Sequence, residues 1–245
     1  MRVYIPLLFC LLSLILRAES FTVSYVKGIV DRVTEEGNKT KRSREIHRLS
    51  LNDPINYGQY VASGPNSFCE LDSTSNLLRI GDQTLIQYLG ENIWQILDGS
   101  ILVCLLSEDT TFSLSSLTGK ASLTGPCTFI AQTTSNGGYK VITLSGKTNI
   151  VIEDKEQTIP SGRLALVLGQ SKDIGDGYDI DLLLLLQSSL LINAFDDLPP
   201  TFGKIRLAVY KQQLKLKSRY NLVIGDAPTD KNLQMWVMGK EADKK

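Results

Sequence analysis

The sequence has little of what most catalytic sites are built from. Among its 245 residues there is one histidine, His47. Catalytic triads and most zinc sites need a histidine held by neighbours in a structured pocket, whereas His47 lies in a polar, basic stretch. The phosphate-binding glycine loop and the HExxH and GxSxG motifs are also missing. We therefore expect a surface position for His47, no catalytic, metal-binding or cofactor-binding residue, and no cofactor.

An excess of charge of either sign is also lacking, because 26 basic residues face 26 acidic ones. A chain so near neutrality has no bulk attraction for nucleic acid or for an anionic membrane. Residues 35–48 hold a basic cluster without apolar periodicity: Lys39, Lys41, Arg42, Arg44 and Arg48. Since no aromatic residues are interleaved with these charges, we expect an exposed loop rather than a binding patch.

Long hydrophobic runs are confined to the N-terminus. Val3–Leu16 is almost wholly apolar, follows Arg2, and is shorter than the ~20 residues that span a bilayer. Ala18-Glu19-Ser20 places small residues where a signal peptidase cleaves. We expect residues 1–20 to be a cleavable signal peptide, with an uncleaved anchor as the alternative. The mature chain would then be periplasmic or extracellular and have no transmembrane segment.

Cysteine is scarce. After the predicted signal peptide the chain has only Cys69, Cys104 and Cys127. None has the CxxC spacing of a zinc or redox site. All three fall in strand-like segments, so we expect small, buried core residues. One disulfide between two of them is the alternative, and the sequence leaves that pairing open.

What the chain does have is a series of short apolar stretches separated by glycines, from Leu49 to Gly169. Turn signals about ten residues apart predict many short strands. In Ile101–Leu106 and in Leu164–Leu168, the residues that would face either side of a strand are all apolar. This pattern predicts strands that are covered on both faces. The expected core residues of the β domain are Ile101, Val103, Leu144, Ile150, Leu164 and Leu166.

Two local patterns refine this prediction. The Asn136-Gly137 pair lies between two strand-like segments and predicts a tight hairpin. Gly99, Gly146 and Gly162 each come just before an apolar strand and form a weak repeat. Such a repeat is compatible with stacked β-coils, although a sandwich has similar punctuation.

The composition changes after residue 170. Residues 171–179 are polar and glycine-containing, which predicts a linker. Residues 180–222 predict a helical extension: Asp179 or Asp181 can cap a helix running to about Phe195, and Thr201–Leu222 favours helix, with a strand still possible from its alternating Lys204–Val209. The extension is too apolar to stand in water alone, so we expect it to cover the β domain. Residues 223–245 form a predicted tail.

Several motifs, taken in order, resemble the FecR-domain family of bacterial envelope proteins. They stand here as Leu51-Asn52-Asp53-Pro54-Ile55, Val61-Ala62-Ser63-Gly64, Leu78-Arg79-Ile80-Gly81-Asp82, Ile96-Leu97-Asp98-Gly99, Leu144-Ser145-Gly146 and Ile159-Pro160-Ser161-Gly162. The resemblance covers residues 21–170, and Tyr178–Phe195 resembles an extension of secreted members. It implies a twisted, β-solenoid-like or sandwich-like domain that binds other envelope components.

In the signalling members of that family, an anti-sigma segment and a membrane helix precede the β domain. Only the signal peptide precedes it here, so the regulatory output is not carried over. We expect a non-enzymatic binding, scaffold or signal-sensing module whose partner is an envelope protein or glycan.

The alternative function is a carbohydrate-active enzyme that uses a pair of carboxylates. The candidate aspartates, all at predicted turns, are Asp53, Asp72, Asp82 and Asp98. Aspartate is also common at turns because it bonds its own loop. Trp94 and Trp236 could stack on a ligand, but core or docking roles are favoured.

Overall fold

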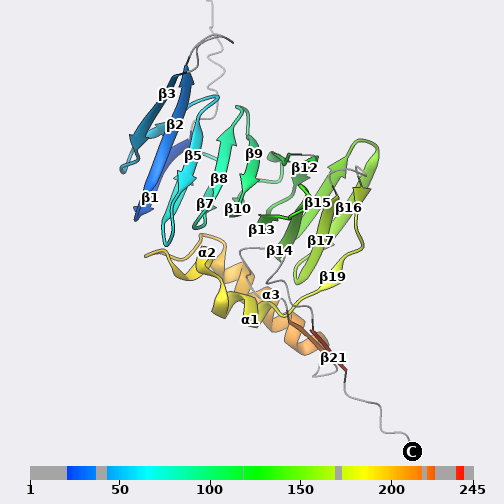
Figure 1. Cartoon of the computed structure of the whole chain (residues 1–245). Helices are drawn as coiled ribbons and strands as arrows, with labels where there is room; N and C mark the ends of the chain where they lie inside the picture. The colour runs from blue at the N-terminus through cyan, green and yellow to red at the C-terminus, as the bar shows by residue number, and fades with distance from the viewer. Residues whose placement is uncertain are drawn as a thin grey trace, which may run out of the picture.

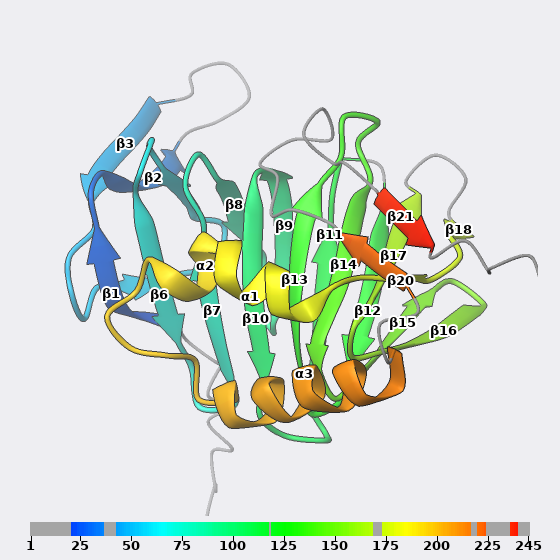
Figure 2. The same cartoon turned by 90° about the horizontal axis from the view of Figure 1, so that it is seen from below.

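The computed structural model of the chain describes residues 21–36, 43–117, 119–168, 173–216, 220–223 and 236–239. Two β-sheets stack face to face, and helices cover the other face of one of them (Figures 1 and 2). The predicted mainly β fold with a short C-terminal helical extension is confirmed. The predicted signal peptide lies outside the described residues, as does most of the predicted tail.

The central sheet lies between the other sheet and the helices. In spatial order its strands are β4 (Pro54–Ile55), β1 (Phe21–Lys27), β6 (Phe68–Asp72), β7 (Asn76–Ile80), β10 (Ser100–Leu105), β13 (Cys127–Thr133), β14 (Tyr139–Ser145), β17 (Arg163–Leu168) and β18 (Asp173–Ile174). β19 (Tyr178–Asp179) also pairs with β17. β18 and β19 fall inside the segment predicted as a linker, which therefore adds short strands to the sheet.

The outer sheet follows the order β3 (Ser43–Arg48), β2 (Val30–Glu36), β5 (Tyr60–Ser63), β8 (Leu85–Tyr88), β9 (Ile93–Asp98), β11 (Thr111–Ser115), β12 (Lys120–Thr124), β15 (Lys147–Ile152) and β16 (Lys155–Pro160). Its pairs are antiparallel except β9 with β11. The chain leaves this sheet after β9, adds β10 to the central sheet and returns as β11. This step is one turn of a β-coil, whereas the rest of the two sheets is sandwich-like. β20 (Tyr220–Val223) and β21 (Trp236–Gly239) form a separate pair.

Glycines mark the points where the chain crosses between the two sheets. Gly99 joins β9 to β10, Gly146 joins β14 to β15, and Gly162 precedes β17, with φ values of 90°, 74° and 84°. A Cβ at Gly99 would collide with the backbone of Thr84, and one at Gly146 with the carbonyl oxygen of Pro126. The weak sequence repeat is thus a repeat of corners between sheets, which require glycine.

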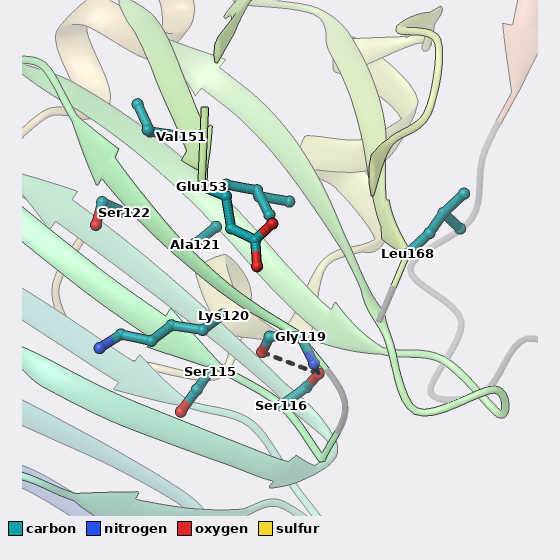
Figure 3. A pocket seen from close by; sticks show the side chains of 10 residues that line it. Ser115, Ser116, Gly119, Lys120, Ala121, Ser122, Val151, Glu153 and Leu168 are labelled. Atoms are coloured by element: carbon teal, nitrogen blue, oxygen red, sulfur yellow. Dashed lines mark hydrogen bonds between the residues drawn. The ribbon is translucent and has the colours of Figure 1, made fainter. Parts of the chain in front are cut away.

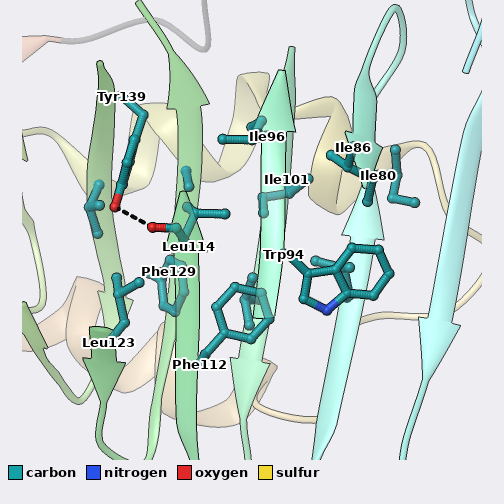
Figure 4. Close-up of a cluster of buried hydrophobic side chains, with 14 of the residues drawn as sticks. Ile80, Ile86, Trp94, Ile96, Ile101, Phe112, Leu114, Leu123, Phe129 and Tyr139 are labelled. Carbon is teal, nitrogen blue, oxygen red and sulfur yellow. Dashed lines mark hydrogen bonds between the residues drawn. The ribbon is translucent and has the colours of Figure 1, made fainter. Parts of the chain in front are cut away.

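The core between the sheets is built from the inward-facing residues of both (Figure 4). Trp94 is fully buried, with its ring centroid 5.1 Å from that of Phe21 and 4.8 Å from that of Tyr88. The predicted core role of Trp94 is therefore confirmed. The Tyr139 hydroxyl donates to the main-chain oxygen of Leu114 over 3.0 Å, which satisfies its polar atom inside the core.

A second core lies between the central sheet and the helical layer, which consists of α1 (Leu182–Ser188), α2 (Leu190–Asn193) and α3 (Phe202–Leu216). Leu102 and Cys104 of β10 point into it, whereas Ile101 and Val103 point into the core between the sheets. The prediction of strands covered on both faces is confirmed. None of the helices in the described part of the chain is long and apolar enough to cross a membrane.

The first predicted helix is interrupted. Asp181 caps α1 as expected, accepting a 3.0 Å hydrogen bond from the Leu184 N–H. At Ser189 the backbone is extended (φ −72°, ψ 118°), so α1 ends and α2 begins. The Asn193 side chain donates to the Leu186 carbonyl oxygen over 2.8 Å, and it stabilises this break by satisfying a group that a continuous helix would pair internally.

The prediction of an exposed loop over residues 35–48 is wrong for the part that the structure describes. β2 and β3 form an antiparallel hairpin at the edge of the outer sheet. Arg44 pairs with Glu35 (3.1 Å) across it, and Arg48 with Asp31 (2.7 Å). β3 is exposed along its whole length. It therefore has no buried face that would require apolar residues at every second position, and this alternation is the pattern from which strands are predicted. Lys39, Lys41 and Arg42 lie outside the described residues.

The hairpin at Asn136-Gly137 is confirmed, because β13 and β14 pair up to Thr133 and Tyr139. Its loop is longer than a two-residue turn, and Gly137 has a positive φ of 85° whereas Asn136 does not. The Asn136 side chain instead accepts a hydrogen bond from the Gly138 N–H (3.1 Å). Side-chain bonding to the loop, rather than a left-handed asparagine, closes the turn.

The six predicted core residues do not share one core. Ile101, Val103 and Ile150 lie between the sheets, whereas Leu144 and Leu164 pack under the helices. Leu166 is only partly buried, against the second core. The alternative left open for Thr201–Leu222 is decided in favour of helix over Phe202–Leu216, which is α3. The predicted helical extension is wrong at its end, because residues 220–222 lie in β20, paired with β21.

Candidate functional site

The single histidine lies at the exposed edge of the outer sheet. His47 is on β3, and its Nε2 is 3.4 Å from a carboxylate oxygen of Asp53. More than half of its side chain is exposed, so the predicted surface position is confirmed. Asp53 also accepts the Ser50 N–H over 2.9 Å, which ties the carboxylate to its own turn.

Of the four candidate aspartates, Asp53 and Asp82 lie in turns, and Asp72 and Asp98 are the last residues of β6 and β9. Asp98 accepts the N–H of Gly99 (2.8 Å), as an aspartate that stabilises its own turn does. Asp72 has Glu70 as its acidic neighbour, and burial, followed by the charge of Glu70, raises the pKa of Asp72. Glu70 itself is bound to Arg79. Among the described contacts, none joins two of the predicted aspartates to each other.

The three cysteines are free and buried on different strands. Burial raises the pKa of Cys69 to about 12 and that of Cys127 to about 11. Burial also raises the pKa of Cys104, although hydrogen bonds with Thr201 and Thr128 act in the opposite direction. The core role predicted for these residues is confirmed, and the disulfide alternative is wrong. Within the described residues, no group of acidic, cysteine and histidine side chains could hold a metal ion.

A pocket of about 540 Å³ opens where two strands of the outer sheet separate (Figure 3). β12 and β15 pair only through Ser122–Thr124, and the pocket lies beyond the last paired residues. Its lining offers serine hydroxyls (Ser115 and Ser122), one cation (Lys120) and one carboxylate (Glu153). These groups can hydrogen-bond a polar ligand, but they do not form the carboxylate pair of a glycosidase.

A buried arginine joins the helical layer to the central sheet. Arg79 of β7 is 1% exposed, and its Nε donates to the Glu70 carboxylate over 2.7 Å. Its two terminal nitrogens donate to the main-chain oxygens of Leu191 (3.3 Å) and Asp197 (2.6 Å). The Phe195 ring lies over the guanidinium, 4.2 Å from its centroid to Cζ. Sequence reasoning missed this cluster, although an arginine in an otherwise apolar strand was visible.

Further polar contacts fix the rest of the layer. The hydroxyls of Thr128 and Thr201 are 2.6 Å apart and fully enclosed between β13 and the start of α3. Gln212 of α3 accepts the Leu182 N–H (3.0 Å) and donates to the Ile180 carbonyl oxygen (2.6 Å). The helices are therefore held at defined positions on the sheet, because buried hydrogen bonds are directional as well as stabilising.

The helical layer exposes several large apolar side chains. The α1–α2 segment and α3 run side by side across the central sheet (Figure 2). A groove of about 510 Å³ lies between them. The exposed large apolar side chains of the helices, which define the outer face of the layer, are Leu183, Leu190, Leu207, Tyr210 and Leu214. On α3, Ile205 and Val209 are buried, whereas Leu207, Tyr210 and Leu214 are exposed.

No family model matches the sequence, and no curated protein matches it. Three chains among solved structures match. Two are crystal structures, at 1.65 Å and 2.50 Å resolution, described as a "putative anti-sigma factor" from Parabacteroides distasonis. They have TM-scores of 0.41 and 0.39 and sequence identities of 11% and 10%, and each match covers 74% of this chain and 99% of the other. The resemblance to the FecR-domain family therefore stays a prediction.

Proposed function

We propose that this chain is an exported, non-enzymatic binding module of the bacterial envelope, with a FecR-type β domain as its rigid support. Its working surface is the outer face of the helical layer, defined above by Leu183, Leu190, Leu207, Tyr210 and Leu214. The single observation that carries the proposal is the exposure of these five side chains on a layer that buried contacts hold in place. Large exposed apolar surface marks interaction sites in folded proteins.

The sheet edges favour a face over an edge as the working surface. β4 and β18, at the ends of the central sheet, are two residues long. The outer sheet ends in β3 and β16, which present charged residues such as Arg44, Glu45 and Lys155. Short strands and charges are the features by which proteins prevent added strands from pairing with an edge. This arrangement gives no support to binding along exposed strand edges.

Site-specific photo-crosslinking in the native envelope tests the surface. A benzophenone amino acid replaces Tyr210, and a control carries it at Thr111, an exposed position on β11 of the outer sheet. We expect an adduct at position 210 that is absent or much weaker at position 111. Equal adducts at both positions, or an adduct at position 111 alone, would overturn the helical layer as the working surface.

Export is tested separately. Because the apolar run is short and Ala18-Glu19-Ser20 follows it, we propose cleavage after Ser20. N-terminal sequencing of the protein from the envelope fraction should then begin at Phe21. A sequence beginning at Met1 would contradict both cleavage and a freely periplasmic chain.

A further inference from the structure

The exposed face of α3 has an ordered arrangement of side chains. Ile205, Ala208 and Val209 are buried against the second core. At 100° per residue, Leu207, Tyr210 and Leu214 lie at the opposite pole of the helix, and they are 52%, 59% and 54% exposed. The helix is therefore apolar on its inner and outer poles alike, and only the inner pole is explained by the fold.

Cations flank the outer pole of α3. Lys204 and Lys211 fall on one side of it and Arg206 on the other, and all three are exposed. The sequence of α3 contains no acidic residue, and neither do α1 and α2. The nearest acidic residues in the chain are the cap Asp181 and, between α2 and α3, Asp196 and Asp197. An apolar stripe flanked by basic side chains is typical of helices that lie in a membrane interface.

We propose that the outer face of the helical layer binds an anionic lipid surface, an inference that rests on the proposed function and names its partner. Leu207, Tyr210 and Leu214 would enter the boundary between headgroups and acyl chains, with Leu183 and Leu190 beside them. Lys204, Lys211 and Arg206 would extend to the lipid phosphates, because long basic side chains bury their stems and keep the charge at the headgroups.

Charge favours lipid over a second copy of the chain. Two copies packed through this face would bring Lys204, Arg206 and Lys211 near the same residues of the other copy, with no acidic residue on the helices to neutralise them. The overall neutrality of the chain is no obstacle, because screening limits these interactions to about 10 Å. The basic residues near the outer face of α3 therefore decide whether this face is attracted to anionic lipid, although the net charge of the whole chain predicts no attraction.

Vesicle flotation with the protein lacking residues 1–20 tests the inference. The probes are phosphatidylcholine vesicles with and without phosphatidylglycerol. We expect binding to the anionic vesicles, weakened by added salt and weak or absent with phosphatidylcholine alone. Replacing Lys204, Arg206 and Lys211 by glutamine should reduce the partition coefficient by roughly a hundredfold, given roughly fivefold for each of the three basic residues. Leu207→Ser combined with Leu214→Ser should reduce it comparably.

A matched control removes the same charge from the other side of the molecule. Lys120, Lys147 and Lys155 are exposed on the outer sheet, and their replacement by glutamine should leave vesicle binding within about twofold of the parent. All altered positions are exposed, so unchanged thermal unfolding of each variant verifies the fold. Equal loss of binding in the control, or equal binding to both kinds of vesicle, would overturn the inference.

The two proposals fail in different ways. If position 210 forms adducts with a protein while the purified chain binds neither kind of vesicle, the lipid inference is wrong and the proposed function stands. Self-adducts at position 210 would favour a second copy and also overturn lipid as the partner. If position 210 forms no adduct in the envelope, the working surface is wrong, and the lipid inference falls with it.

Discussion

The Arg79 guanidinium on β7 and the main-chain oxygen of Asp197 are 2.6 Å apart, although 118 positions separate them in the chain. The same guanidinium binds Glu70 and the carbonyl oxygen of Leu191. One fully buried side chain thus connects the β domain to the segment that leads from α2 to α3. The helical layer is part of the folded unit because its main chain completes the hydrogen bonds of a buried cation.

Arg79→Ala should destabilise the protein by about 3–5 kcal/mol, because it leaves the carboxylate of Glu70 without its buried partner. Urea unfolding of the purified protein measures the change. Arg48→Ala is the matched control: it breaks an arginine–carboxylate pair of equal length (2.7 Å) that is half exposed, so it should cost at most about 1 kcal/mol. Similar losses for the two variants would refute the role given to Arg79.

Gly99→Ala should destabilise the corner between β9 and β10 by several kcal/mol. The left-handed backbone alone costs alanine about 1–2 kcal/mol, and the new methyl group would also collide with the main chain of Thr84. Gly58 has a similar φ of 82° but open space around its Cα, so Gly58→Ala isolates the backbone term. Calorimetric melting temperatures should therefore fall much further for Gly99→Ala, and equal shifts would show that the close approach is unimportant.

The buried thiols should resist modification in the folded state. Burial raises the pKa of Cys69 from 9.0 to about 12, so little thiolate exists near pH 8, and solvent access is also blocked. A thiol reagent such as DTNB should react slowly with the native protein. In urea, which unfolds the protein, it should react readily with Cys69, Cys104 and Cys127. Thr111→Cys, which adds an exposed thiol, should react at once and serves as the control.

The same pKa shift predicts a loss of stability at alkaline pH. The folded state holds the proton of Cys69 more tightly than the unfolded state, so the stabilisation is complete below about pH 9 and is lost as the pH rises towards 12. The free energy of unfolding should therefore fall more steeply with pH above 9 in the parent than in Cys69→Ala. Parallel slopes would contradict this assignment.

A chain truncated after Lys172 should expose the second core. Leu102, Ile130 and Leu144 pack against the helices, and without them this sheet face would meet water. Binding of a hydrophobic dye such as ANS, together with aggregation in light scattering, should therefore increase in the truncated chain. A truncated protein that stayed monomeric, dye-free and equally stable would show that the helices are not needed to cover the sheet.

Much of the fold follows from short-range patterns. The apolar residues of Ile101–Leu106 predict a strand covered on both faces because side chains alternate along any strand, whatever packs against it. The strand itself, β10, ends one residue earlier, at Leu105. The inter-sheet corners are visible at Gly99 and Gly146 because only glycine adopts their backbone freely. The cap at Asp181 is likewise local, since its bond reaches only three residues along the chain.

Other features depend on residues that meet only after folding. The β2–β3 hairpin is stabilised by ion pairs such as Arg48 with Asp31, which composition alone cannot distinguish from the charges of a loop. In α3, Ile205 and Val209 are buried whereas Leu207, Tyr210 and Leu214 are exposed. The contacts that accompany this orientation, Thr201 with Thr128 and Gln212 with Leu182, join residues far apart in the chain. The sequence determined that the chain has strands, corners and an apolar extension, because those depend on neighbours along the chain. Only the tertiary structure decided which apolar surface stays exposed, because burial is a property of the whole packing arrangement.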